Sequence, residues 1–234
     1  MDPHVLALFP LWYAAFLLSL TCHEAAHAWA ARRGGDDTAY LAGQVTLNPL
    51  PHVQREPIGT ILVPLLTYFM GSHHWMMGWA SAPYDPRWEA RHPRRAAAMS
   101  AAGPAANLLL AAAAFTALKL GLLAGWWVEP PLRVIADQLV VAPTGAAAAL
   151  DGLGRFLSIV LTLNIVLAVF NLIPVPPLDG ISVLAGLVPP LRRVYERSRE
   201  LPVMSLVGIL VAWRISPFLV GPAWRGVVGL LLGS

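Results

Sequence analysis

Apolar residues are concentrated in seven segments of the chain, separated by short polar stretches. These segments cover residues 5–31, 57–71, 96–125, 154–172, 181–189, 201–213 and 217–232. A helix needs about 20 apolar residues to cross a bilayer, so only the first, third and fourth segments are clearly long enough. The last two form either two short spans or one span broken near Pro217. This pattern predicts an all-α polytopic membrane protein with about five or six transmembrane helices.

Arginine residues predict how these helices are oriented. Three clusters follow the first, second and fourth segments: Arg32, Arg33 and Arg55; Arg87, Arg91, Arg94 and Arg95; and Arg192, Arg193, Arg197 and Arg199. If residues 57–71 crossed the membrane, one of the first two clusters would lie outside, against the positive-inside rule. We therefore expect this short segment, which contains Pro64, to re-enter on the same side and to pack beside a cavity. The N-terminus is then expected to face away from the cytoplasm.

The stretch TAYLAGQVTLNPLP at residues 38–51 is open to two interpretations. Tyr40, Val45 and Thr46 favour β-structure, and Asn48-Pro49 is a typical stop signal. A short strand or β-hairpin at the membrane surface, with an edge near 43–47, is one interpretation. An ordinary loop is the other.

Composition agrees with a membrane protein. The chain of 234 residues is 57% hydrophobic and 12% charged, whereas soluble domains carry about 25% charged residues. The net charge of only +3 argues against a nucleic-acid partner, although the pI is about 9.4. The single cysteine, Cys22, excludes an intramolecular disulfide and a cysteine-based zinc cluster. Because the first ten residues contain no Lys or Arg, we expect residues 5–33 to be a retained helix rather than a signal peptide.

The first apolar segment ends in the motif HEAAH, which is typical of zinc peptidases. His23 and His27 are four positions apart, so on a helix they share one face and can bind one ion. Glu24 lies beside them and can accept a proton from a water whose pKa zinc lowers to about 7. Ionisable residues inside a membrane segment are costly, so a functional role is favoured over a cluster of interfacial polar residues.

A catalytic zinc site usually has three protein ligands, so a third one is needed. Most other acidic residues fall in evident loops, but Asp179 has apolar sequence on both sides. Pro174, Pro176 and Pro177 break the preceding helix, and a new helix is expected to begin near Asp179. Asp179 is thus either a zinc ligand or a helix cap.

These motifs resemble the site-2 protease family of intramembrane zinc metalloproteases, in particular its short bacterial members. HEAAH at 23–27, AGPAAN at 102–107 and NLIPVPPLDG at 171–180 occur in the order typical of that family. The resemblance implies that His23, His27 and Asp179 bind one zinc ion and that Glu24 is the general base. It also implies that Asn107 lies near the active site and helps to hold the substrate or the tetrahedral intermediate. For Asn107, a hydrogen bond that joins neighbouring helices is an equal alternative.

The sequence therefore predicts a single integral-membrane domain over residues 1–234, with a catalytic core at about 5–190 and C-terminal helices at 201–234. The expected partners are the lipid bilayer and a transmembrane protein substrate, and the expected location is the bacterial inner membrane. The alternative is a catalytically inactive membrane protein that binds zinc or client helices. An inactive relative would be expected to lack Glu24 or a ligand, and this chain has all four residues.

Overall fold

The computed structural model describes residues 3–71, 75–132 and 134–233, and these residues are mostly helical. The elements in chain order are α1 (Pro3–Arg33), α2 (Thr38–Leu41), α3 (Pro49–Arg55), the π-helical η1 (Ile58–Leu62), α4 (Val63–Met70), α5 (Pro86–Arg91), α6 (Pro93–Leu123), α7 (Ala148–Asn171), α8 (Asp179–Leu187), α9 (Pro189–Glu200) and α10 (Pro202–Leu232). In this part of the chain there is no sheet, only the isolated bridges Val128–Val141 and Ile135–Gln138.

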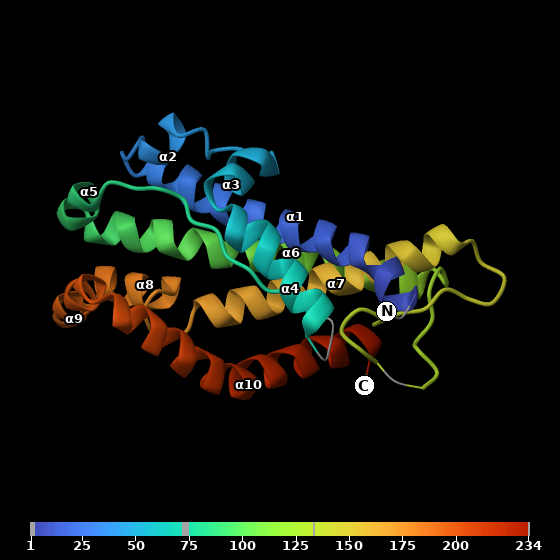
Figure 1. Ribbon diagram of the computed structural model, residues 1–234. Coiled ribbons are helices and arrows are strands. Elements are labelled where there is room, and N and C mark those ends of the chain that lie inside the picture. Colours follow the sequence, from blue (N-terminus) through green and yellow to red (C-terminus); the bar gives the residue numbers. More distant parts are fainter. Residues whose placement is uncertain (1–2, 72–74, 133, 234) are drawn as a thin grey trace.

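Four of the described helices are long and apolar enough to cross a membrane: α1, α6, α7 and α10. They run alternately in opposite directions, and α5, α8 and α9 gather at one end of the bundle (Figure 1). Helix α7 is the most central, since 56% of its most apolar window is buried, against 11% for α10. The main core joins all four helices through side chains such as Phe16, Leu118, Ile159 and Leu231.

The sequence pattern predicted about five or six transmembrane helices, whereas the described residues contain four helices of sufficient length. The number is smaller because residues 201–213 and 217–232 form one helix. Helix α10 continues through Pro217 and Pro222. A proline lacks the N–H that would bond to the carbonyl four residues earlier. For Pro217 that carbonyl belongs to Trp213, and the Ser216 hydroxyl donates to it at 3.2 Å. Serine hydroxyls can satisfy freed carbonyls in this way, which allows a membrane helix to continue past a proline.

Of the two interpretations of residues 38–51, the structure agrees with a loop and not with a strand or hairpin near residues 43–47. Helix α2 ends at Leu41, and turns and bends follow. Local side chains satisfy the backbone here: Asp36 Oδ1 accepts from Thr38 N at 2.9 Å, and Asn48 Oδ1 accepts from Leu50 N at 3.0 Å. Such local bonds compete with a β-ladder, and they explain why β-prone residues did not form one.

The short apolar segment forms η1 and α4, and residues 75–85 lie alongside it without regular secondary structure. Two side-chain bonds tie its beginning to its return: Ser81 Oγ donates to Glu56 Oε1 at 2.7 Å, and Arg55 Nε donates to Ser81 O at 2.9 Å. Trp79 N also donates to Gly59 O at 3.1 Å. The start of the segment and residues 79–81 therefore lie side by side, and the chain then continues to α5 (Figure 1).

Candidate metal centre

Helix α1 directs the predicted motif into the bundle. His23, Glu24 and His27 are all buried, although they lie near the end of a helix whose opposite side is exposed. One ligand atom from each of the three lies within 4.8 Å of the others. The four-residue spacing brings the two rings together, with Nε2 atoms 3.0 Å apart and ring planes at 83°.

The other nitrogen of each histidine faces an acceptor on α6. His27 Nδ1 lies 2.8 Å from Met99 O, and His23 Nδ1 lies 2.5 Å from Asn107 Oδ1. Carbonyl oxygens only accept hydrogen bonds, so each Nδ1 carries a hydrogen, and in the neutral imidazole each Nε2 then presents a lone pair. Histidine ligands of metals are usually held in this way, with the second nitrogen donating to a carbonyl.

Asp179 joins these histidines from α8. Its Oδ2 lies 3.2 Å from His23 Nε2 and its Oδ1 lies 3.4 Å from His27 Nε2. Oδ2 is buried and has no hydrogen-bond partner. The N-cap position of α8 belongs to Leu178, and no side-chain capping bond is present there. The carboxylate is thus directed toward the two imidazoles and not toward the backbone of its own helix.

Gly103 leaves the space that this cluster needs. A Cβ atom at this position would lie 2.3 Å from His27 Nε2 and 2.6 Å from His23 Nε2. Met99, Gly103 and Asn107 are spaced by four residues, so they form one stripe of α6 that faces α1. The AGPAAN motif contains Gly103, but the sequence pattern singled out only Asn107. The spacing of Gly103 from Asn107 was the signal that both lie on the same face. The role of the Met99 carbonyl left no trace in the sequence.

The donor set fits a zinc ion. Two imidazole nitrogens with lone pairs and one carboxylate converge on the space beside Gly103. With both imidazoles neutral, the Nε2 lone pairs and the carboxylate would repel one another unless a cation lay between them, and a carboxylate without such a partner is costly in an apolar surrounding. Two histidines and one carboxylate form a common ligand set of catalytic zinc sites, which keep a fourth position open.

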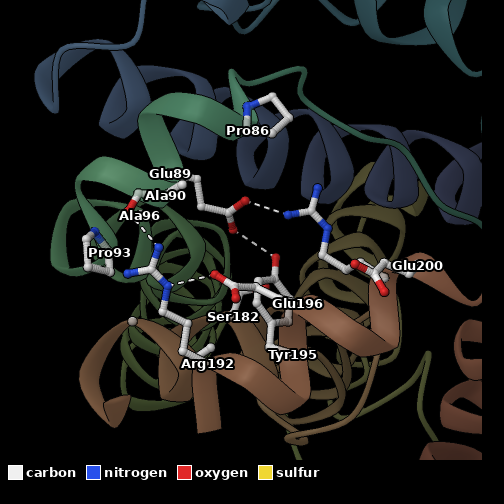
Figure 2. Close-up of a pocket in the computed structure, with 13 residues that line it drawn as sticks. Pro86, Glu89, Ala90, Pro93, Ala96, Ser182, Arg192, Tyr195, Glu196 and Glu200 are labelled. Carbon is white, nitrogen blue, oxygen red and sulfur yellow. Dashed lines mark hydrogen bonds and ion pairs between the residues drawn. The ribbon is translucent and has the colours of Figure 1, made fainter. Parts of the chain in front are cut away.

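A second group of polar residues lies beside α8, apart from the histidine cluster. A cavity of about 350 Å³ lies between α5, α6, α8 and α9, and Figure 2 shows Glu89 directed toward Tyr195 across it. Tyr195 Oη donates to Glu89 Oε1 at 2.9 Å, and Arg199 Nη1 donates to Glu89 Oε2 at 2.5 Å. Burial and the Glu89 carboxylate raise the pKa of Tyr195, so its hydroxyl keeps the proton that it donates. None of the predicted site residues lines this cavity.

This cavity is therefore separate from the histidine cluster, but the two are connected through α8. Asp179 is the first residue of α8, whereas Ser182, Ala185 and Gly186 of the same helix line the cavity. The start of α8 is fixed by close contact with the end of α7, because a Cβ at Gly180 would lie 2.3 Å from Leu172 O. The position of α8, and hence of the Asp179 carboxylate, depends on contacts at both of these places.

Comparison with known proteins identifies relatives over most of the chain. Residues 12–214 match the family model described as peptidase family M50. One relative is YwhC of Bacillus subtilis, which is named as an expected zinc metalloprotease. It is 38% identical over 186 residues, covering 79% of this chain and 72% of YwhC. Rip2 of Mycolicibacterium smegmatis, named for the same expected activity, is 29% identical over 204 residues, covering 87% of this chain and 67% of Rip2. Rip2 of Mycobacterium tuberculosis H37Rv is 27% identical over 206 residues. No solved structure is significantly similar to the chain.

Proposed function

Because the chain belongs to peptidase family M50, the site-2 protease family, we propose that this zinc metalloprotease is an intramembrane endopeptidase that cleaves transmembrane segments of other membrane proteins. The observation that carries the proposal is the meeting of His23, His27 and Asp179 beside Glu24. These four residues come from two distant parts of the chain and meet inside a bundle of apolar helices. A water-dependent reaction on a membrane-embedded peptide needs such a buried polar site.

In this proposal the ligands are His23 Nε2, His27 Nε2 and the Asp179 carboxylate. Zinc held by these residues would supply Lewis-acid chemistry, which lowers the pKa of a water to about 7. The Glu24 carboxylate takes up that proton as general base and can pass it to the leaving amine. Met99 O and Asn107 Oδ1 hold the two imidazoles in the tautomer that leaves Nε2 free. The expectation that Asn107 also holds the substrate stays a prediction, since the structure engages its amide with His23 and with neighbouring helices.

The substrate is a transmembrane helix that must first become extended. Peptide bonds inside a helix are covered by their own hydrogen bonds and by side chains, so water cannot attack them until the helix unwinds. The histidine-bearing helix α1 has no acidic residue in its first turn and has Arg32 and Arg33 in its last. With the arginines on the cytoplasmic side, His23 and His27 lie toward that side, and cleavage is expected there.

The chain is a multi-pass membrane protein, as its four long apolar helices and its family indicate. We place it in the bacterial inner membrane with the N-terminus outside. In this orientation η1 and α4 enter from the cytoplasmic side and return to it. The bonds that Ser81 makes with Glu56 and Arg55 support this re-entrant arrangement.

The decisive experiment compares the purified wild-type protein with Glu24→Gln in liposomes that contain a transmembrane substrate peptide. We expect the wild type to cleave the peptide and Glu24→Gln to bind the same amount of zinc without cleaving it, because Glu24 is not a ligand. Equal cleavage by both proteins would contradict the role of Glu24. Zinc binding by the wild type with no cleavage of any transmembrane client would favour the alternative, an inactive zinc- or client-binding protein.

A further inference from the structure

A chain of buried polar side chains extends from His23 into the centre of the bundle. Asn107 of α6, Asn164 of α7 and Ser19 of α1 are each 0% exposed. Asn107 Nδ2 donates to Asn164 Oδ1 at 2.7 Å, and Asn164 Nδ2 donates to Ser19 Oγ at 2.8 Å. We infer that Asn164 is a positioning residue for the zinc site, which acts on His23 through Asn107. This inference rests on the proposed function only in taking His23 as a zinc ligand.

Two backbone carbonyls determine the direction of every hydrogen bond in this series of buried side chains. Asn164 Nδ2 also lies 2.8 Å from Val160 O, and Asn107 Nδ2 also lies 3.3 Å from Ser19 O. Because a carbonyl only accepts, the nitrogen of each amide must face it. The oxygen of Asn164 is then left for Asn107, and the oxygen of Asn107 is left for His23. Ser19 completes the order, since its hydroxyl donates to Ala15 O at 2.7 Å and accepts from Asn164.

The consequence falls on the tautomer of His23. With Asn107 Oδ1 as the only group facing it at 2.5 Å among the described contacts, His23 Nδ1 must carry a hydrogen. In the neutral ring the lone pair of His23 is then on Nε2, the atom 3.2 Å from Asp179 Oδ2. If Asn107 rotated its amide by half a turn, Nδ2 would face His23 Nδ1 and favour the opposite tautomer. Asn164 prevents this rotation because its oxygen accepts from Nδ2.

The two histidines therefore depend on different supports. His27 is held by the Met99 carbonyl, which belongs to the α6 backbone and cannot rotate. His23 is held by a side-chain amide, which can. A second amide, from the most buried helix of the bundle, removes that freedom. The alternative role for Asn164 is only to join helices, as buried amides do in membrane bundles. The two roles differ in what they predict for zinc affinity.

The test is a double-mutant cycle on zinc affinity, measured by chelator competition on the full-length protein in detergent. We expect Asn164→Leu and Asn107→Leu each to weaken zinc binding by about 10- to 100-fold, as the loss of an outer-shell partner does. We expect the double variant to bind zinc no more weakly than Asn107→Leu alone, because Asn164 acts through Asn107. Ser158→Ala is the control. Ser158 is 0% exposed on the same helix and is bonded to Gly154 and Leu139, and its loss should leave zinc affinity unchanged.

Three results would overturn the inference. One is wild-type zinc affinity in Asn164→Leu, and another is additive losses in the double variant. The third is an equal loss in Ser158→Ala, which would indicate a general effect on α7. If Asn164→Leu does not fold, Asn164→Ala enters the same cycle with the same expected results. Because the cycle measures zinc and not cleavage, a wild-type protein that binds zinc without cleaving would refute the proposed function and leave this test valid.

Discussion

At the scale of single residues, the candidate site depends on the charge of one carboxylate. Replacing Asp179 by Asn keeps the size of the side chain and an oxygen that could cap α8. A cap would therefore tolerate the change, whereas a zinc ligand would not, because the carboxylate charge balances the ion. We expect the Asp179→Asn protein to insert and fold but to lose cleavage. Its zinc affinity should fall by at least about 10- to 100-fold, which is the loss seen when only a partner of a ligand is removed. Zinc analysis and cleavage of a transmembrane peptide measure the two effects.

Glu24→Gln is the matched control for this change, since it alters a neighbouring carboxylate that is not a ligand. It should keep zinc and lose cleavage. If Asp179→Asn cleaves at the wild-type rate with full zinc, the third ligand lies elsewhere.

Gly103 gives a second prediction at this scale, one that concerns space and not charge. A Cβ atom there would lie within 2.6 Å of both Nε2 atoms, so Gly103→Ala should push the imidazoles out of place. We expect loss of zinc binding and of cleavage, with the helical content unchanged by circular dichroism. Gly152→Ala serves as control, because Gly152 lies in α7 and a Cβ there would meet no atom within 4 Å. Zinc bound by Gly103→Ala as tightly as by Gly152→Ala would show that the ion does not lie beside α6.

At the scale of elements, the contacts around Glu89 of α5 hold α9 against α5. Glu89 is the common acceptor for Tyr195 and Arg199, and its side chain is only 14% exposed. Removing this acceptor leaves the buried Tyr195 hydroxyl unpaired, which costs about 1–3 kcal/mol, whereas Arg199 is 39% exposed and can bond to water instead. We expect Glu89→Ala to increase hydrogen exchange in α9 and, because α8 begins at Asp179, to weaken zinc binding. Hydrogen-exchange mass spectrometry and chelator competition would measure these effects.

Glu196→Ala is the appropriate comparison, since Glu196 lines the same cavity but pairs with Arg192 at the surface. Exposed pairs of this type contribute about 0.3–0.5 kcal/mol. Its exchange should match the wild type. Unchanged exchange in Glu89→Ala as well would mean that packing alone holds α9 in place.

At the scale of the whole molecule, the alternating direction of four long helices fixes which loops share a side. Asp85 N donates to Asp36 Oδ2 at 2.8 Å, so the loop after α1 and the loop before α5 lie together. We expect cysteines at exposed positions 37 and 87, in a Cys22→Ala background, to be labelled from the cytoplasmic side. A cysteine at exposed position 144, between α6 and α7, should be labelled from the opposite side. Labelling of 37 and 87 from opposite sides would show that η1 and α4 cross the membrane.

The parts of this protein that the sequence determined by itself depend on short-range geometry. The length of an apolar run decides whether a helix can cross a bilayer, and α1, α6 and α7 were predicted on that basis. Spacing by four residues decides which side chains share a helix face, and this spacing alone places His23 and His27 side by side. Asp179 was selected because its apolar surroundings set it apart from the acidic residues of the loops.

Tertiary structure decided the features that depend on contacts between residues distant in the sequence. It also decided which of several competing local hydrogen bonds forms. Residues 201–213 and 217–232 were open to one helix or two, and in the structure α10 continues through both prolines, with Ser216 Oγ donating to the carbonyl that Pro217 left free. The β-prone residues after α1 formed turns because Asp36 and Asn48 bonded to the nearby backbone, and the sequence could not rank these bonds against a ladder. The approach of Asp179 to the histidines required α8 to pack against α6 and its start to lie close to Leu172, just after α7. The direction of the hydrogen bonds from Asn164 to His23 depended on two backbone carbonyls. Val160 O is a local contact within α7, whereas the position of Ser19 O beside Asn107 follows only from the packing of α1 against α6.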